Sequence, residues 1–287
     1  MDEVVLADIV AGLRNGSVVP YLGPGALADV VNPITGNPMP ADNESLILAM
    51  NNGKPMAPRL MYEFSRAAMN MELRRGRQFL NRFLVKTYGA ETSWTRSVVH
   101  QRLASCKPPY VIDVNRDMQL QQAYQDTPHT LIVGVARISG ADYRFRIYAY
   151  TGGAYQEIDD AQVDTALPIL FKPLGSPCPT PSFIASDADF VDYITELMGG
   201  FAIPPFLKRY RRQKRYVLLG LRLTRDTERM ILSEIIYGAA SPAGWALIPD
   251  PTPKEQRFCE KLGLRIINAN LSALQAELET ETALCVC

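Results

Sequence analysis

The segment that most constrains the fold is an apolar run, Val18–Leu22, followed by Gly23-Pro24-Gly25. A strand that ends in glycines and opens into a helix-compatible segment is typical of turns that hold a phosphate, because glycine lets the backbone approach the ligand. The third position of the dinucleotide-binding fingerprint is Ala28 and not glycine. Since Gly-Pro-Gly also forms ordinary tight turns, a ligand loop and a plain turn are both open interpretations. Either way, we predict that the run is the first strand of a sheet of the nucleotide-binding type.

Short apolar runs alternate with amphipathic segments along the rest of the chain. Strands that are apolar on both faces and alternate with helices indicate a parallel sheet covered by helices on both sides. We therefore predict one Rossmann-like α/β domain over residues 1–287, with a helical insert at 27–105 and a β-hairpin insert at 128–152. Beyond the first strand, the pattern predicts strands at 110–115, 166–171, 216–221 and 265–269, and helices at 2–16, 44–50, 59–88, 94–104, 186–198, 226–237 and 272–280.

Charge excludes a general attraction to polyanions. Thirty basic residues balance thirty acidic ones, which argues against a nucleic-acid partner. The run 208–215 holds six basic residues, and it is either a patch for an anionic partner or a solvated helix end. The N-terminus lacks the features of a signal peptide and no apolar run is long enough to span a bilayer, so we expect a cytoplasmic protein without a membrane partner.

Cysteine spacing predicts no metal centre. The five cysteines contain no Cys-x-x-Cys pair, so neither a zinc site nor a disulfide framework is indicated, and we expect no zinc and no other metal. The role of the closing Cys285-Val286-Cys287 stays open. The five are Cys106, Cys178, Cys259, Cys285 and Cys287.

The order of motifs resembles that of sirtuin-like NAD-binding domains, which are common in bacteria and occur in antiphage defence proteins. In that family the motifs are a strand with a Gly-Ala-Gly loop, a His-containing helix, a strand ending in Thr-Thr-Asn-Tyr-Asp, a Lys-Leu-His-Gly-Ser loop, a strand before Gly-Tyr-Ser-x-x-Asp, and a late strand ending in Ile-Asn. The resemblance covers residues 8–280. The matching segments are Pro20–Gly25, His100–Ala104, Tyr110–Asp117, Lys172–Ser176, Val217–Leu221 with Asp226, and Ile266–Asn268.

The resemblance implies a nucleotide ligand, NAD or ADP-ribose. In the family the glycine loop contacts the pyrophosphate, the Asn after the second strand positions the nicotinamide ribose, and the late Gly and Asn line the adenosine side. Carried over position by position, the implied contacts are Gly23, Gly25, Ala26, Asn115, Gly220 and Asn268.

Departures from the family pattern bear on catalysis. The family's general base, a His, is replaced by Leu174, which can neither accept a proton nor bind a ribose hydroxyl, and a positioned base is worth about 100- to 10,000-fold in rate. Asp113, Val114 and Arg116 replace the residues around the conserved Asn, and a carboxylate at Asp113 is expected to repel a pyrophosphate. Of the family's catalytic residues, this sequence therefore keeps only the Asn, at Asn115.

Three functions follow from these matches and departures. The first is a nucleotide-binding module with degenerate catalysis. The second is an NAD glycohydrolase in which Asn115 orients a water. The third is a structural or partner-binding protein, including a homo-oligomer, with no nucleotide. Of the two histidines, we expect His100 to be structural and His129 to lie in a surface loop.

Overall fold

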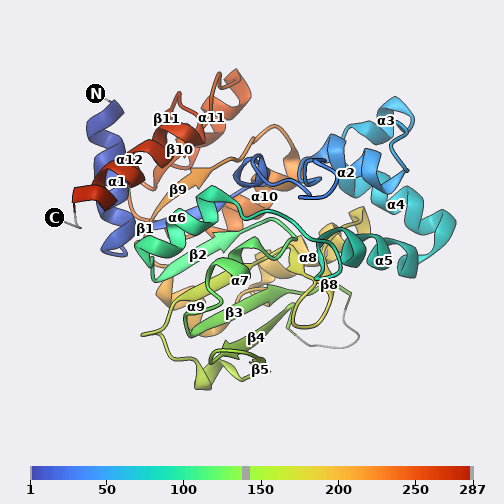
Figure 1. The fold of residues 1–287 in the computed structure, drawn as a ribbon, viewed down its shortest axis with the longest axis horizontal. Coiled ribbons are helices and arrows are strands. Elements are labelled where there is room, and N and C mark those ends of the chain that lie inside the picture. Colours follow the sequence, from blue (N-terminus) through green and yellow to red (C-terminus); the bar gives the residue numbers. More distant parts are fainter. Residues whose placement is uncertain (1, 138–142, 285–287) are drawn as a thin grey trace.

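A nine-stranded sheet forms the centre of the protein (Figure 1). The computed structural model describes residues 2–137 and 143–284. In the sheet formed by these residues, the order is β11-β10-β9-β1-β2-β6-β3-β4-β5, with all pairs from β11 to β3 parallel and with β4 and β5 added antiparallel. The predicted Rossmann-like α/β fold is confirmed. The strands are β1 (Val18–Leu22), β2 (Tyr110–Asp113), β3 (His129–Gly134), β4 (Phe145–Tyr150), β5 (Tyr155–Glu157), β6 (Ile169–Lys172), β9 (Arg215–Leu219), β10 (Gly244–Leu247) and β11 (Leu264–Ile267), while β7 (Gly175–Ser176) and β8 (Ser182–Phe183) pair separately.

Helices cover both faces of this sheet because its strands are apolar on both sides. Val18 and Leu22 of β1 pack in one core cluster and Val19 and Tyr21 in another, as the two-residue period of a strand requires. The first cluster includes side chains of α1 (Asp2–Arg14), α6 (Val98–Cys106), α7 (Gln119–Ala123) and α12 (Leu271–Leu284). The second includes side chains of α8 (Asp187–Gly199), α9 (Pro205–Tyr210), α10 (Asp226–Ile235) and α11 (Pro253–Lys261).

A helical module stands beside this sandwich (Figure 1). It consists of α2 (Asn43–Met50), α3 (Pro58–Met61), α4 (Phe64–Arg75) and α5 (Arg77–Tyr88), which share a separate apolar cluster. The region predicted as helical over 59–88 is divided into α3, α4 and α5, because the chain breaks between α3 and α4 and again at Gly76. Gly76 has φ +80°, a conformation that glycine adopts without strain, and it lets α5 fold back against α4.

The hairpin predicted within 128–152 is present as β3 and β4, and its turn, 138–142, lies outside the described residues. Since β3 also pairs in parallel with β6, the hairpin extends the main sheet. His129 is wrongly predicted as a surface residue, because it begins β3 and is fully buried. Its two ring nitrogens lie 2.7 Å from the Thr127 carbonyl and 2.8 Å from the Tyr155 hydroxyl, which makes burial of the polar ring tolerable.

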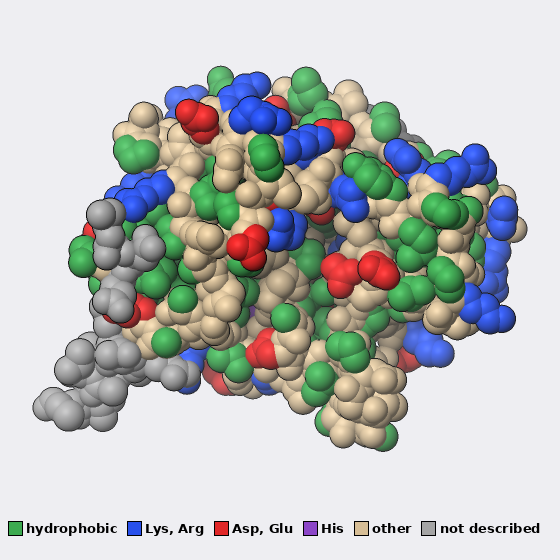
Figure 2. All heavy atoms as spheres, turned by 90° about the horizontal axis from the view of Figure 1, so that it is seen from above, with side chains coloured by type: hydrophobic (Ala, Val, Ile, Leu, Met, Phe, Trp, Pro, Cys, Tyr) green, Lys and Arg blue, Asp and Glu red, His purple; other side chains and the backbone are tan. Residues whose placement is uncertain are grey.

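The basic run 208–215 is largely engaged within the fold. The Arg211 guanidinium is buried and donates to the Glu234 carbonyl and to that of Ile235 at the end of α10. Lys214 lies 5.0 Å from the centre of the Tyr210 ring, while Arg209 and Arg212 are exposed. On the face in Figure 2, basic and acidic side chains both occur among apolar ones. The run is therefore partly built into the fold, and only Arg209 and Arg212 among its basic residues are exposed.

No helix among the described residues combines the length and apolar character needed to cross a membrane.

Candidate functional site

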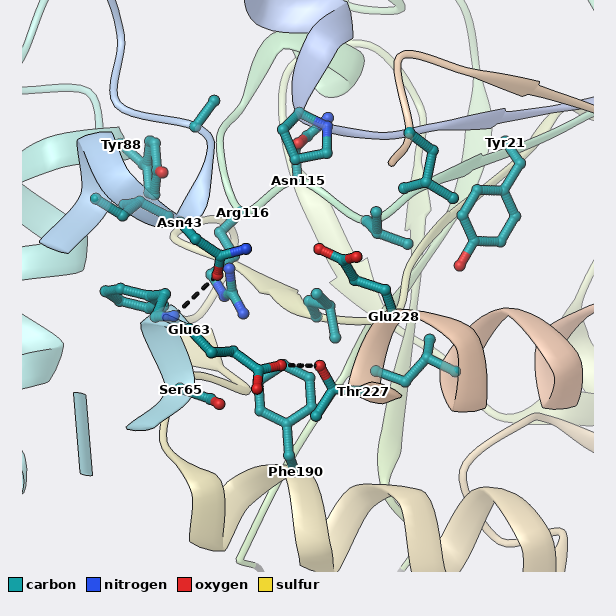
Figure 3. Close-up of a pocket in the computed structure, with 18 residues that line it drawn as sticks. Tyr21, Asn43, Glu63, Ser65, Tyr88, Asn115, Arg116, Phe190, Thr227 and Glu228 are labelled. Carbon is teal, nitrogen blue, oxygen red and sulfur yellow. Dashed lines mark hydrogen bonds between the residues drawn. The ribbon is translucent and has the colours of Figure 1, made fainter. Parts of the chain in front are cut away.

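A small cavity lies where the carboxyl ends of β1 and β2 meet the helical module (Figure 3). Parallel sheets place ligand sites at this edge, where strand order reverses around a central strand. The cavity has a volume of about 80 Å³, and residues from four parts of the fold line it. The strands and their following loops contribute Tyr21, Pro24, Asn115, Arg116 and Leu174; the helical module contributes Asn43, Glu63, Phe64 and Tyr88; α8 contributes Phe190; and α10 contributes Thr227 and Glu228.

A wider groove of about 890 Å³ adjoins this cavity. It runs from the 3₁₀ turn η1 (Pro24–Leu27) past Gly220 and Arg225 to the first turn of α12. The cavity and the groove form one crevice, because five residues line both: Pro24, Ala41, Asn43, Leu221 and Glu228.

The glycines of the first loop allow two strand ends to touch. The Gly23 N–H donates to the Leu219 carbonyl at 2.9 Å, and the Gly25 N–H donates to the Gly220 carbonyl at 2.8 Å. A Cβ on Gly25 would lie 2.8 Å from the Gly220 Cα, which only glycine avoids. The Ala26 N–H in turn donates to Gly23. These three amides therefore have acceptors within the protein, and the loop shapes the crevice through its backbone.

Asn115 presents a single acceptor to the cavity. Its side-chain amide nitrogen donates to the Gly23 carbonyl at 2.9 Å and to Asp113 Oδ1 at 2.8 Å. Both N–H bonds of the amide are therefore used, and Oδ1 is the atom left for a ligand. A ligand group at this position has to be a donor, such as a hydroxyl or a water.

Asp113, which accepts a hydrogen bond from the Asn115 side chain, belongs to a buried cluster of charged groups. Asp113 lies 2.8 Å from Lys172 Nζ and 3.4 Å from His100 Nε2, and its pKa is held below its usual range because these two groups outweigh the opposing effect of burial. His100 Nδ1 lies 2.8 Å from Ser97, whose hydroxyl donates to a carbonyl, so this nitrogen carries a proton. Lys172 thus matches the charge of Asp113 inside the protein, which weakens the expected repulsion of a pyrophosphate, and the burial of His100 is in keeping with the structural role expected for it.

Leu174 lies on the cavity wall together with Asn115. The two positions that the resemblance pairs as base and ribose contact are thus brought to one site by the loop after β6 and the loop after β2. Arg116 contributes a cation to the same cavity wall, and its guanidinium donates two hydrogen bonds to the Ile184 carbonyl. Burial lowers the pKa of Arg116 to about 10 against the opposing effect of Tyr88, so it stays charged at neutral pH.

Glu228 is the cavity residue that the sequence analysis missed. Burial raises its pKa to about 7, with Glu63 adding to the shift while the Arg225 N–H and the Asn43 side chain oppose it. Thr227 donates a hydrogen bond to the Glu63 carboxylate beside it (Figure 3). An acidic residue in the first turn of a helix ordinarily serves the helix N-terminus, which is why the sequence gave no signal for a second role.

The groove also holds donors for an anion. Arg225 lines it with its guanidinium 3.8 Å from the centre of the Tyr62 ring, and its buried Nε finds no hydrogen-bond partner among the described residues. Asn270 and Ser272 contribute from the start of α12. Asn268, the predicted adenosine contact, is instead exposed and accepts from the Asp250 N–H at 3.0 Å, so it fixes the turn after β10.

Within residues 2–137 and 143–284, no three His, Cys, Asp or Glu side chains are grouped as metal ligands would be. Cys285 and Cys287 lie outside the described residues.

Comparison with protein-family models and with curated proteins returned no match for this chain.

Proposed function

We propose that the crevice binds a nucleotide of the NAD or ADP-ribose class, with the adenosine diphosphate part in the groove and the second ribose at the mouth of the cavity. The observation that supports this most is the convergence of Asn115 and Leu174 on a cavity that continues into the groove past Gly25 and Gly220. The order of those four residues along the chain carries the resemblance to sirtuin-like domains.

The donors and acceptors of the crevice fit such a ligand. The groove volume of about 890 Å³ falls in the range of small-molecule sites. The Arg225 guanidinium lines the groove and stacks on the Tyr62 ring, with no hydrogen bond to its Nε among the described residues, and the first turn of the 14-residue helix α12 contains no acidic residue, so both favour phosphate oxygens. Asn115 Oδ1 accepts from a ribose hydroxyl. The phosphate contacts in this proposal thus come from Arg225 and α12, since the glycine-loop amides are already bonded.

The size of the cavity limits what passes beyond the ribose. Its volume of about 80 Å³ is well below the roughly 150 Å³ that accommodates benzene in an engineered protein. Water or a hydroxyl fits there directly, whereas a nicotinamide ring requires the helical module to shift. We therefore expect ADP-ribose to bind more tightly than NAD.

Titration calorimetry with ADP-ribose, NAD and AMP tests the proposal. We expect Arg225→Gln to weaken ADP-ribose binding by about 10- to 100-fold, the worth of a charge-assisted hydrogen bond. Arg212→Gln, an exposed arginine outside the crevice, is the matched control and should leave the affinity unchanged. Absence of binding for all three ligands at millimolar concentration would contradict the proposal.

A second function, hydrolysis of NAD to nicotinamide and ADP-ribose, has one observation in its favour. A carboxyl group, Glu228, stands where the groove meets the cavity although the family's base is absent at Leu174.

A further inference from the structure

We propose that Glu228 is the proton acceptor for cleavage of an N-glycosidic bond in this crevice, in the role left vacant at Leu174. This inference rests on the proposed nucleotide site. It places the base on α10, an element from a different part of the chain than the loop that carries Leu174.

Position is the first argument for Glu228. It is the one carboxylate among the residues shared by the groove and the cavity, so a ligand that enters along the groove meets it at the cavity mouth. In Figure 3 its carboxyl group lies amid the lining residues, with Asn43 and Arg116 to its left and Thr227 below it. The cavity mouth suits a nucleophilic water held by Glu228 beside the ribose that Asn115 binds.

The other ionisable groups of the cavity are unsuited to take a proton. Burial raises the pKa of Tyr21 and of Tyr88, so both phenols stay protonated at neutral pH. Arg116 is a cation, and Glu63 lies in the cavity wall and not among the residues shared with the groove. Glu228 titrates near pH 7, the range in which a general base combines availability with driving force.

Charge also favours cleavage at this place. The groups that face Glu228 are Glu63, Arg225, Tyr21 and the Asn43 amide. The carboxyl groups of Glu228 at the mouth and of Glu63 in the cavity wall stabilise the positive charge that develops on a ribose carbon as its bond to a leaving group lengthens. The geometry therefore suits a substrate with a cationic leaving group, such as the pyridinium ring of NAD.

The step balances without a further reactant. Glu228 takes one proton from the water as the water oxygen bonds to C1′ of the ribose. The bond from C1′ to the ring nitrogen breaks, and its electron pair goes to that nitrogen, which turns the pyridinium into neutral nicotinamide. NAD and water thus give ADP-ribose, nicotinamide and a proton, which Glu228 releases to solvent through the groove.

The test measures ADP-ribose affinity and nicotinamide release separately. We expect Glu228→Gln to keep the affinity but to lower nicotinamide release by about 100- to 10,000-fold and to remove the ionisation near pH 7 from the rate profile. Glu228→Asp should restore part of the rate, because it keeps a carboxylate. Glu234→Gln, on the same helix and outside the crevice, should behave as the wild type.

Two results would overturn the inference and leave the nucleotide site intact: binding of NAD by the wild type without release of nicotinamide, or equal release by Glu228→Gln. A wild type that binds neither ligand would overturn the site and the inference together.

Discussion

The raised pKa of Glu228 predicts how the free energy of unfolding changes with pH. Its pKa is about 7 in the folded protein against a usual value of 4.5. Because the folded state favours the protonated carboxyl, its contribution to stability is complete below pH 4.5 and is lost as the pH rises through 7. At about 1.4 kcal/mol per pKa unit, the ionised form costs the folded protein about 3 kcal/mol at pH 9.

Glu228→Gln should remove this cost, because glutamine stays neutral and its oxygen can still accept from the Arg225 N–H. Urea unfolding of wild type and variant measures the difference directly. We expect the variant to be more stable by up to about 3 kcal/mol at pH 9 and by less than about 1 kcal/mol at pH 5.

Glu255→Gln is the control, and it should change the stability of the protein in the opposite direction. Although burial opposes it, hydrogen bonds from Thr252 and Arg222 lower the pKa of Glu255, so its ionised form is stabilising and the variant should lose stability at both pH values. A Glu228→Gln variant no more stable than the wild type at pH 9 would refute the account of Glu228 as a buried carboxyl held near neutrality.

Three further predictions concern the loops around the crevice. Gly220→Ala places a Cβ 2.5 Å from the Ala26 nitrogen at φ +67°, and should cost about 2 to 4 kcal/mol in thermal or urea unfolding; a neutral effect would contradict the close contact of the two loops. Lys172→Met removes the main counter-ion of Asp113 and should lower the free energy of unfolding by about 3 to 5 kcal/mol. The double variant Lys172→Met with Asp113→Asn should recover most of this loss. Equal stability of Lys172→Met and the wild type would refute the pairing. Leu174→His should create or raise nicotinamide release, because an imidazole that titrates near pH 6.5 would stand in the cavity of Asn115, with a gain of at most about 10,000-fold; unchanged release with NAD bound would show that the site does not support this base.

The sheet was predictable because most of its strands are short apolar runs that can be recognised in the local sequence. Runs such as Val18–Leu22 are apolar at every position, as a strand buried on both faces requires. Strand β10 was missed because it is short and begins at Gly244, and glycine is depleted in strands. In the fold this glycine has φ +131°, and a Cβ there would lie 1.9 Å from the Tyr216 carbonyl oxygen, so packing against β9 demands glycine inside a strand.

The candidate site was predictable only where it depends on strand ends. Asn115 and Leu174 follow neighbouring strands, β2 and β6, and the edge of a parallel sheet brings such positions together. The role of Gly25 was not predictable, because its amide bonds to Gly220, a residue far along the chain. Glu228 escaped notice since its burial depends on α2 and α4, whose placement the local sequence does not specify.

A structure of the protein determined with ADP-ribose at saturating concentration tests the central claim most directly. The account predicts the phosphates near Arg225 and the first turn of α12, with the terminal ribose donating a hydroxyl hydrogen bond to Asn115 Oδ1 beside Glu228. Ligand bound at another face of the molecule, with the crevice between Gly220 and Asn115 left without it, would contradict the account.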